Sequence, residues 1–339
     1  MPKPEIIYNK LIIVKQKGIV FNNKICYNLC REVFYMNTKH KTSIGGQALI
    51  EGVMMRGPEV TAMAVRNPEG ELVIEKFPTE GKDKPKILKL PFVRGIFNMI
   101  DSLRFGYKCL MRSAEIAGFE EEEDEKKQGV IMGALMVISS VLAVILSVGL
   151  FVYLPTLIFD LLKGAFPAIN NNIWRSVFEG VLRIIVFICY LLLTLLMKDI
   201  RRTFAYHGAE HKTIFCYEAG EELTVENVRK QKRFHPRCGT SFMILVLIVG
   251  IIVGFFIPAS LPRLLRTVIK LLLLPVIVGI GYELIKLAGR HENIITRIIS
   301  APGVWLQHIT TIEPDDSMIE AAIAAMLEVI PENREDAKW

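Results

Sequence analysis

The sequence is poor in the features that identify several common classes of protein. It has 6 cysteines scattered over 339 residues, so no disulfide framework is expected. Its first apolar run is short, is interrupted by Lys10, Lys15 and Lys17, and is followed by no small-residue cleavage site, so no signal peptide is expected. The glycines after Ser43 are not followed by G-x-x-x-x-G-K, which excludes a phosphate-binding loop of that kind.

Strong charge and common nucleophile motifs are also missing. The net charge is only +6, and no basic stripe interleaved with aromatic residues appears, so nucleic acid is not an expected partner. There is no serine elbow, and Cys216 has no evident base other than His211. The excess of Lys and Arg is better suited to anionic lipid.

Apolar residues, by contrast, are abundant and concentrated. They make up 51% of the chain and predict an α-helical integral membrane protein with about four transmembrane helices, over residues 130–154, 178–197, 242–257 and 268–287. Residues 128–197 hold the first two spans and 242–288 the last two, with a short outer connection over 155–172. Lys and Arg crowd the segment 198–241, whereas the outer connection has few, so that segment and both termini are expected in the cytoplasm of a multi-pass cell-membrane protein.

The remaining segments predict small soluble parts. Residues 1–42 form a basic arm without a clear pattern, and translation beginning at Met36 would remove most of it. Residues 43–90 predict a β-rich unit, with a hairpin turn at 67–70. Residues 91–127 predict an amphipathic helix and an acidic linker; the helix suits either a membrane surface or packing on the β unit. Residues 289–339 end in a helix over 317–330.

The segment 198–241 carries the most specific chemistry. His207 and His211 lie four residues apart, so a helix would place them on one face beside Glu210, in the H-x-x-E-H arrangement of the inverted zinc peptidases. His235 and Cys238 stand in H-P-R-C-G, which is similar to a zinc knuckle. The prediction is a zinc ion held by these three histidines and the cysteine, with Glu210 as the base that takes a proton from water.

Glu283 is a further candidate because it lies inside the last predicted span, where a carboxylate needs a partner. An enzyme would use His207, His211 and one or two of His235, Cys238 and Glu283, leaving one position for water. A four-ligand site would instead be structural, in a non-catalytic scaffold, assembly or transport factor. Histidines bonded to carboxylates and membrane-surface phosphates, without metal, are a third alternative. A transport role would require a homo-oligomer, because four spans with few buried charges make a poor pathway on their own.

Long motifs resemble a known family. G-G-Q-A-L-I-E-G-V-M-M-R-G-P, Y-H-G-A-E-H-K, H-P-R-C-G-T-S-F and L-Q-H-I-T-T-I-E-P-D-D are similar, in this order, to motifs of the YqhQ-like membrane proteins of Gram-positive and related bacteria. The resemblance covers residues 43–327; the first 35 residues depart from it. It implies a domain of unknown function labelled a predicted metal-dependent enzyme. Its motif positions here are Gln47, Glu51, Arg56, His207, Glu210, His211, Glu218, His235, Cys238, Glu283, Thr310 and Glu313.

Overall fold

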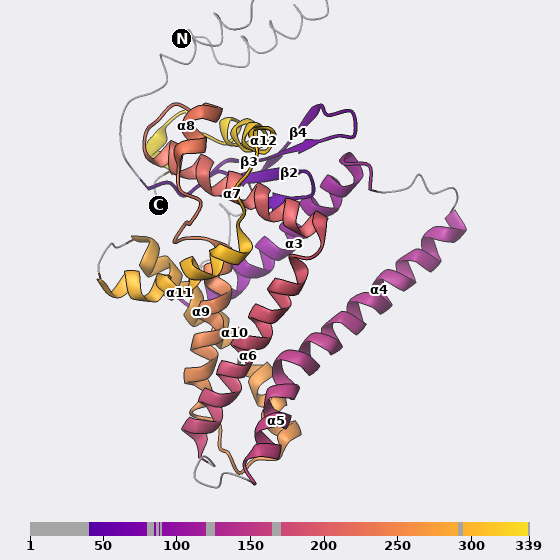
Figure 1. Ribbon diagram of the computed structural model, residues 1–339, viewed down its shortest axis with the longest axis vertical. Coiled ribbons are helices and arrows are strands. Elements are labelled where there is room, and N and C mark those ends of the chain that lie inside the picture. The colour runs from indigo at the N-terminus through magenta and orange to yellow at the C-terminus, as the bar shows by residue number, and fades with distance from the viewer. Residues whose placement is uncertain are drawn as a thin grey trace, which may run out of the picture.

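The protein consists of a small α/β unit seated on one end of a bundle of helices (Figure 1). The computed structural model describes residues 41–79, 85, 88, 90–119, 126–164, 171–290 and 294–337. The basic arm before residue 41, Met36 within it, and most of the acidic linker lie outside these residues.

A four-stranded antiparallel sheet forms the centre of the α/β unit. Its strands are β1 (Gly45–Leu49), β2 (Gly52–Arg56), β3 (Val60–Arg66) and β4 (Leu72–Pro78), which pair in chain order. The predicted hairpin is confirmed, because β3 and β4 pair and the amide of Gly70 donates to the carbonyl of Asn67 at 3.0 Å. Gly70 has a φ of 82°, which an L side chain rarely adopts. The β-rich unit expected from 43 onward therefore forms.

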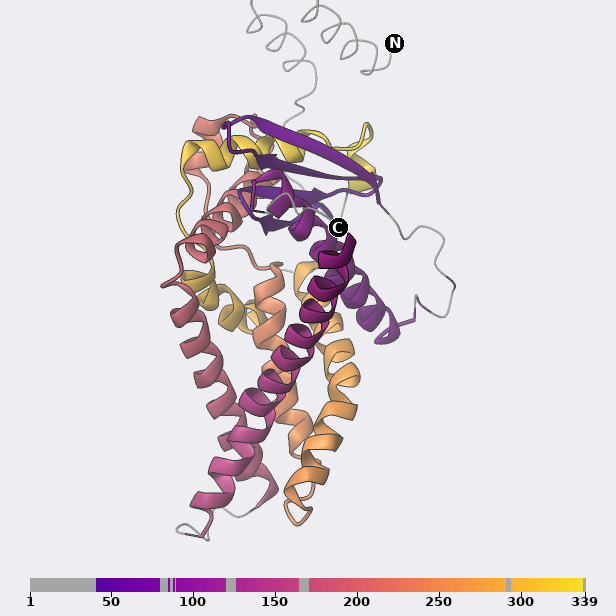
Figure 2. The ribbon, with the colours of Figure 1, turned by 90° about the vertical axis from the view of Figure 1, so that its right-hand side faces the viewer.

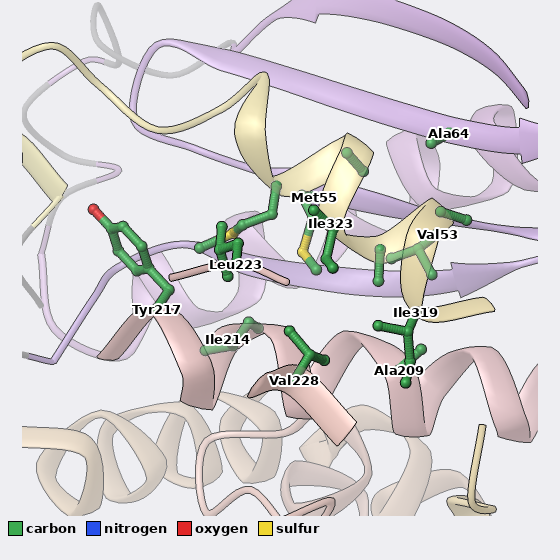
Figure 3. Packing of buried hydrophobic residues seen from close by; sticks show 14 of the residues in the cluster. Val53, Met55, Ala64, Ala209, Ile214, Tyr217, Leu223, Val228, Ile319 and Ile323 are labelled. Atoms are coloured by element: carbon green, nitrogen blue, oxygen red, sulfur yellow. The ribbon is translucent and has the colours of Figure 1, made fainter. Parts of the chain in front are cut away.

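Helices cover both faces of this sheet because the side chains of each strand alternate between them. Val53, Met55 and Ala64 point to α7 (Lys198–Glu218) and α12 (Asp316–Leu327) and form the main buried core (Figure 3). Met54 and Met63 pack on the other face against α3 (Val93–Ile116). The short helices α8 (Val225–Lys230) and η4 (Arg334–Ala337) complete the unit.

The second part of the molecule is the helical bundle. Its elements are α4 (Lys126–Val148), the π-helical η2 (Gly149–Tyr153), α5 (Leu154–Leu162), α6 (Asn172–Thr194), α9 (Gly239–Gly254), α10 (Arg263–Arg290) and α11 (Ile294–Thr310). Three helical stretches, Val137–Leu162, Asn172–Thr194 and Arg263–Ala288, are long and apolar enough to cross a membrane. The third predicted span corresponds to α9, which has only 16 residues. At 1.5 Å per residue it measures about 24 Å, less than the roughly 30 Å of a hydrocarbon core.

Helix α9 is held closely by its neighbours. Glycines of three helices abut it: Gly180 of α6 meets Ile251, Gly281 of α10 meets Val246, and Gly303 of α11 meets Ser241. A Cβ at any of these glycines would approach α9 within 3.0 Å. By contrast α4 leaves the bundle at an angle, as the two views in Figures 1 and 2 show, and its side chains from 137 to 147 are exposed.

Three segments differ from the expectation in form. The apolar helix does not end at residue 154 but runs through α5, because Pro155 occupies a first-turn position, where proline is tolerated. The segment 198–241, a connection between spans in which a helix was expected around His207 and His211, begins with the 21-residue helix α7, whose apolar side chains belong to the main core. Helix α3 packs on the sheet and on α10, yet Ile100, Leu103 and Tyr107 of its predicted apolar face stay exposed.

Candidate metal centre

Two elements bring three of the four expected ligands together. His207 and His211 lie one turn apart on α7, with ring centroids 4.4 Å apart. Cys238 is the N-cap residue of α9. One ligand atom from each of these three side chains lies within 4.8 Å of the other two. They form a group that could hold a metal ion.

Backbone carbonyls orient both imidazoles. Nδ1 of His207 lies 2.9 Å from the carbonyl oxygen of Thr310, and Nδ1 of His211 lies 2.5 Å from that of Arg233. A carbonyl can only accept a hydrogen bond, so in each neutral ring the proton is on Nδ1 and the lone pair is on Nε2. Nε2 of His207 in turn lies 3.1 Å from Sγ of Cys238. This is the usual arrangement in which an outer hydrogen bond fixes the tautomer of a metal-binding histidine.

Gly208 explains how the carbonyl of Thr310 reaches His207. The chain after α11 runs along α7, where the amide of Ile312 donates to the carbonyl of Phe204 at 2.9 Å. A Cβ at residue 208 would collide with the carbonyl oxygen of Ile312. The glycine in H-G-A-E-H therefore allows the segment carrying Thr310 to lie close to the helix.

The electrostatics of the group favour a thiolate beside a charged imidazole. Burial alone raises the pKa of the Cys238 thiol, but the positive field of His207 and His211 outweighs burial and holds that pKa well below its usual range. Burial lowers the pKa of His207, and the nearby Cys238 thiolate overcomes this and raises it to about 9. The amide of Thr240 also donates to Sγ of Cys238 at 3.4 Å, from the positive end of the α9 dipole. The thiolate is the form of cysteine that binds metal.

Glu210 lies beside the group and faces the sheet. Its side chain is buried, with 5% of the residue exposed, and burial raises the pKa of its carboxyl, opposed by His211 and His207. The amide of Gly46 on β1 donates a hydrogen bond to it. A Cβ at residue 46 would lie 2.8 Å from Cγ and 2.9 Å from Cδ of Glu210. The G-G-Q motif thus supplies the only kind of residue that fits this contact.

His235, the fourth expected ligand, is not part of the group of three. Its Nε2 lies 3.8 Å from the carboxylate of Glu218 and 3.3 Å from Nη2 of Arg237. Its main chain is held by Gln307, whose Oε1 accepts from the amide at 2.7 Å and whose Nε2 donates to the carbonyl at 2.7 Å. Burial, the largest cause, lowers the pKa of His235 to about 4. The H-P-R-C-G turn brings Cys238 to the group and turns His235 toward Glu218.

The other candidate acids pair with cations away from the three ligands. Glu283 accepts from Nε of Arg94 at 2.7 Å, which supplies the partner that an intramembrane carboxylate needs. The further pairs are Glu51 with Arg202, Glu218 with Arg237, and Glu313 with Lys212. These four acids are not brought to the metal group.

Some contributors to the site carry no signal in the sequence, and others have a weak one. The carbonyls of Thr310 and Arg233 act through the backbone, which every residue has. Gln307 could be noticed in the sequence only because it stands in the L-Q-H-I-T-T motif, next to His308. Its Nε2 also donates to Oγ of Ser241 at 3.0 Å. Gln47 and Arg56 lie on the sheet near α3, where Nε2 of Gln47 donates to Gly106 and the Arg56 guanidinium lies over the Phe105 ring.

Comparisons with known proteins agree with the resemblance seen in the motifs. The sequence profile described as "Protein of unknown function (DUF1385)" matches residues 90–332. The "Uncharacterized protein YqhQ" of Bacillus subtilis (strain 168) is 35% identical over 304 residues, which cover 86% of this chain and 94% of that protein. No solved structure matches. The chain therefore belongs to the DUF1385 family, and YqhQ of B. subtilis is a relative of it.

Proposed function

We propose that this protein is a membrane-bound, zinc-dependent hydrolase whose site is formed by His207, His211, Cys238 and Glu210. The observation that carries the proposal is the group of three ligand atoms within 4.8 Å of one another. The carbonyl contacts to both Nδ1 atoms support it, because they leave the Nε2 lone pairs for an ion. Nitrogen and sulfur ligands favour zinc over magnesium or calcium.

The number of ligands supports a catalytic rather than a structural ion. Structural zinc sites are closed by four protein ligands, whereas catalytic sites use three and keep one position for water or substrate. His235, which would have closed the site, is held by Glu218 and Gln307. A bound zinc supplies a lowered pKa for a water molecule in the open position.

Glu210 is the residue proposed to move the proton. It directly precedes His211 and follows His207 by three residues, it is buried, and its carboxyl has a raised pKa because of that burial. A carboxyl with a raised pKa can take a proton from water and return it to a leaving group near neutral pH. Gly46 fixes its position through the amide hydrogen bond.

The membrane part of the proposal is four spans with the α/β unit in the cytoplasm. Three helices have the required length and apolar character, and α9 packs among them as the fourth. The crowding of Lys and Arg in residues 198–241 supports the cytoplasmic side. The exposed side chains of α4 would face lipid or a second copy in a homo-oligomer.

A second candidate function uses Cys238 as a nucleophile without metal. The specific observation is the 3.1 Å contact between Sγ and Nε2 of His207 at the start of α9, together with the low pKa of the thiol. A thiolate next to an imidazolium at a helix N-terminus is the arrangement of activated cysteines. His207 would then serve as the acid for the leaving group.

Zinc content and complementation of a deletion strain separate these functions. The purified parent should hold roughly one zinc per chain, and Cys238→Ser should lose zinc and complementation together. Cys109→Ser is the matched control, since Cys109 is a free, buried cysteine on α3 outside the group. A parent without zinc whose activity still requires Cys238 would favour the nucleophile and reject the zinc site. Zinc at the parental level in Cys238→Ser would also reject the proposed zinc site.

A further inference from the structure

A second charged cluster lies at the end of the bundle remote from the sheet (Figure 1). It is formed by Asp160 of α5, by residues of α6 and by residues of α10. Six cationic side chains share two carboxylates in this cationic cluster, which comprises Asp160, Lys163, Arg175, Glu179, Arg183, Arg263, Arg266 and Lys270. The sequence predicted few buried charges in the spans, so this cluster is unexpected.

Glu179 is the centre of the cationic cluster. Its carboxylate lies 3.1 Å from Nε of Arg175, 3.6 Å from Nη2 of Arg266 and 3.7 Å from Nη2 of Arg183, and it also pairs with Lys270. The glutamate is 1% exposed. Two of these distances, to Arg266 and Arg183, exceed those of a hydrogen bond, so this carboxylate does not satisfy all four cations.

The cationic cluster is therefore short of negative charge. Six cations and two carboxylates leave four positive charges, and no third carboxylate pairs with these six side chains within the described residues. The intervening residues 165–170 contain no Asp or Glu. Arg266 is only 1% exposed, and its Nε has no hydrogen-bond partner among the described residues. A buried guanidinium whose charge is incompletely balanced and whose Nε lacks a hydrogen-bond partner is costly, which points to an anion as the missing partner.

An open cavity of about 970 Å³ adjoins the cationic cluster. Its lining includes Trp174, Pro258 and Ala259. Arg175 and Arg266 donate to the carbonyls of Ala259 and Pro258 at 3.5 and 3.2 Å, so both guanidiniums contact residues that line this cavity. Trp174 is 57% exposed, as tryptophans at a membrane–water interface often are.

We infer that the cationic cluster binds a phosphate-bearing anion, either a phospholipid headgroup at this membrane face or free phosphate. Arginines in a forked arrangement suit phosphate oxygens, and several donors converge here from two helices. The anion would neutralise the excess charge and join α6 to α10. This inference does not rest on the zinc site, which lies at the opposite end of the bundle.

Thermal unfolding of the full chain in neutral detergent tests the inference. One titration uses inorganic phosphate against sodium chloride of equal ionic strength, and the other uses phosphatidylglycerol against diacylglycerol with the same chains. Saturating anion should raise Tm by about 5 °C. A rise with inorganic phosphate identifies the free ion as a ligand, and a rise with phosphatidylglycerol alone identifies the headgroup.

Three variants show whether the cationic cluster is responsible. Arg266→Gln should weaken the apparent affinity about tenfold or more. Arg263→Gln, at the half-exposed rim, should weaken it less and serves if the buried variant does not fold. Lys230→Gln, whose side chain is exposed on α8, is the control and should respond as the parent does. No stabilisation of the parent by either anion, or equal responses of the Arg263 and Lys230 variants, would overturn the inference.

Discussion

Gly46 leaves no room for a methyl group between the sheet and Glu210, which makes Gly46→Ala an informative change. The added Cβ would lie 2.6 Å from the carbonyl oxygen of Met54 and 2.8 Å from Cγ of Glu210. The carbonyl belongs to a paired strand, so relief of both contacts requires a shift of the strand backbone as well as of the Glu210 side chain. Overpacking of this kind costs about 1–3 kcal/mol. For a protein of this size each kcal/mol lowers Tm by roughly 2–4 °C.

The neighbouring glycine supplies the control. Gly45 precedes it on the same strand, and a Cβ there would meet no atom within 4 Å. Gly45→Ala should therefore keep the parental Tm and complementation. Gly46→Ala should melt several degrees lower and lose complementation, while its zinc content, measured by elemental analysis, stays near that of the parent because the three ligands are untouched. Equal behaviour of the two variants would refute the role given to the Gly46–Glu210 contact.

Three further predictions address the base, the buried histidine and the orientation. Glu210→Gln should keep zinc and lose complementation, whereas His211→Ala should lose both. Full complementation by the Gln variant would show that Glu210 does not act as the base. Burial lowers the pKa of His235 to about 4. As the pH falls, this imidazole therefore takes up a proton near pH 6.5 in the unfolded chain but only near pH 4 in the folded chain. Stability should therefore be full above about pH 6.5 and decline toward pH 4 by at most about 3 kcal/mol. Denaturant unfolding of His235→Gln should show a shallower decline, and parallel curves would contradict this account. In intact cells an impermeant thiol reagent should label a reporter cysteine near Asn171 and not one near Glu222; the reverse pattern would place the α/β unit outside.

The ligand pair on α7 was predictable because helical spacing alone fixes which side chains share a face. His207 and His211 needed only the 3.6-residue period and helix-forming surroundings. The hairpin with its turn at residues 67–70 was predictable for a similar reason, since its turn residues act locally. Cys238 was found because H-P-R-C-G is similar to a zinc knuckle.

Contacts between distant segments were not predictable in this way. His235 turns to Glu218 because Gln307, 72 residues later, holds both sides of its peptide backbone. Glu283 pairs with Arg94, 189 residues earlier, although the sequence indicated only that it needed some partner. The spacing of His207 and His211 indicated a helix only around these residues of a polar segment, and the burial of the apolar side chains of α7 in the main core follows from contacts with the sheet and α12.

The position of Cys238 at the first turn of α9 ties the site to the tilt of a helix in the bundle. A helix about 24 Å long that tilts by about 5° moves its end by roughly 2 Å, whereas metal–ligand distances tolerate only about 0.2 Å. The zinc site proposed here can therefore be no more rigid than the seating of α9. Gly180, Gly281 and Gly303 press three neighbouring helices against it. These contacts, none of which involves a ligand atom, set the accuracy with which the sulfur meets the two imidazoles, and a bilayer that changed the tilt of α9 would change the geometry of the site.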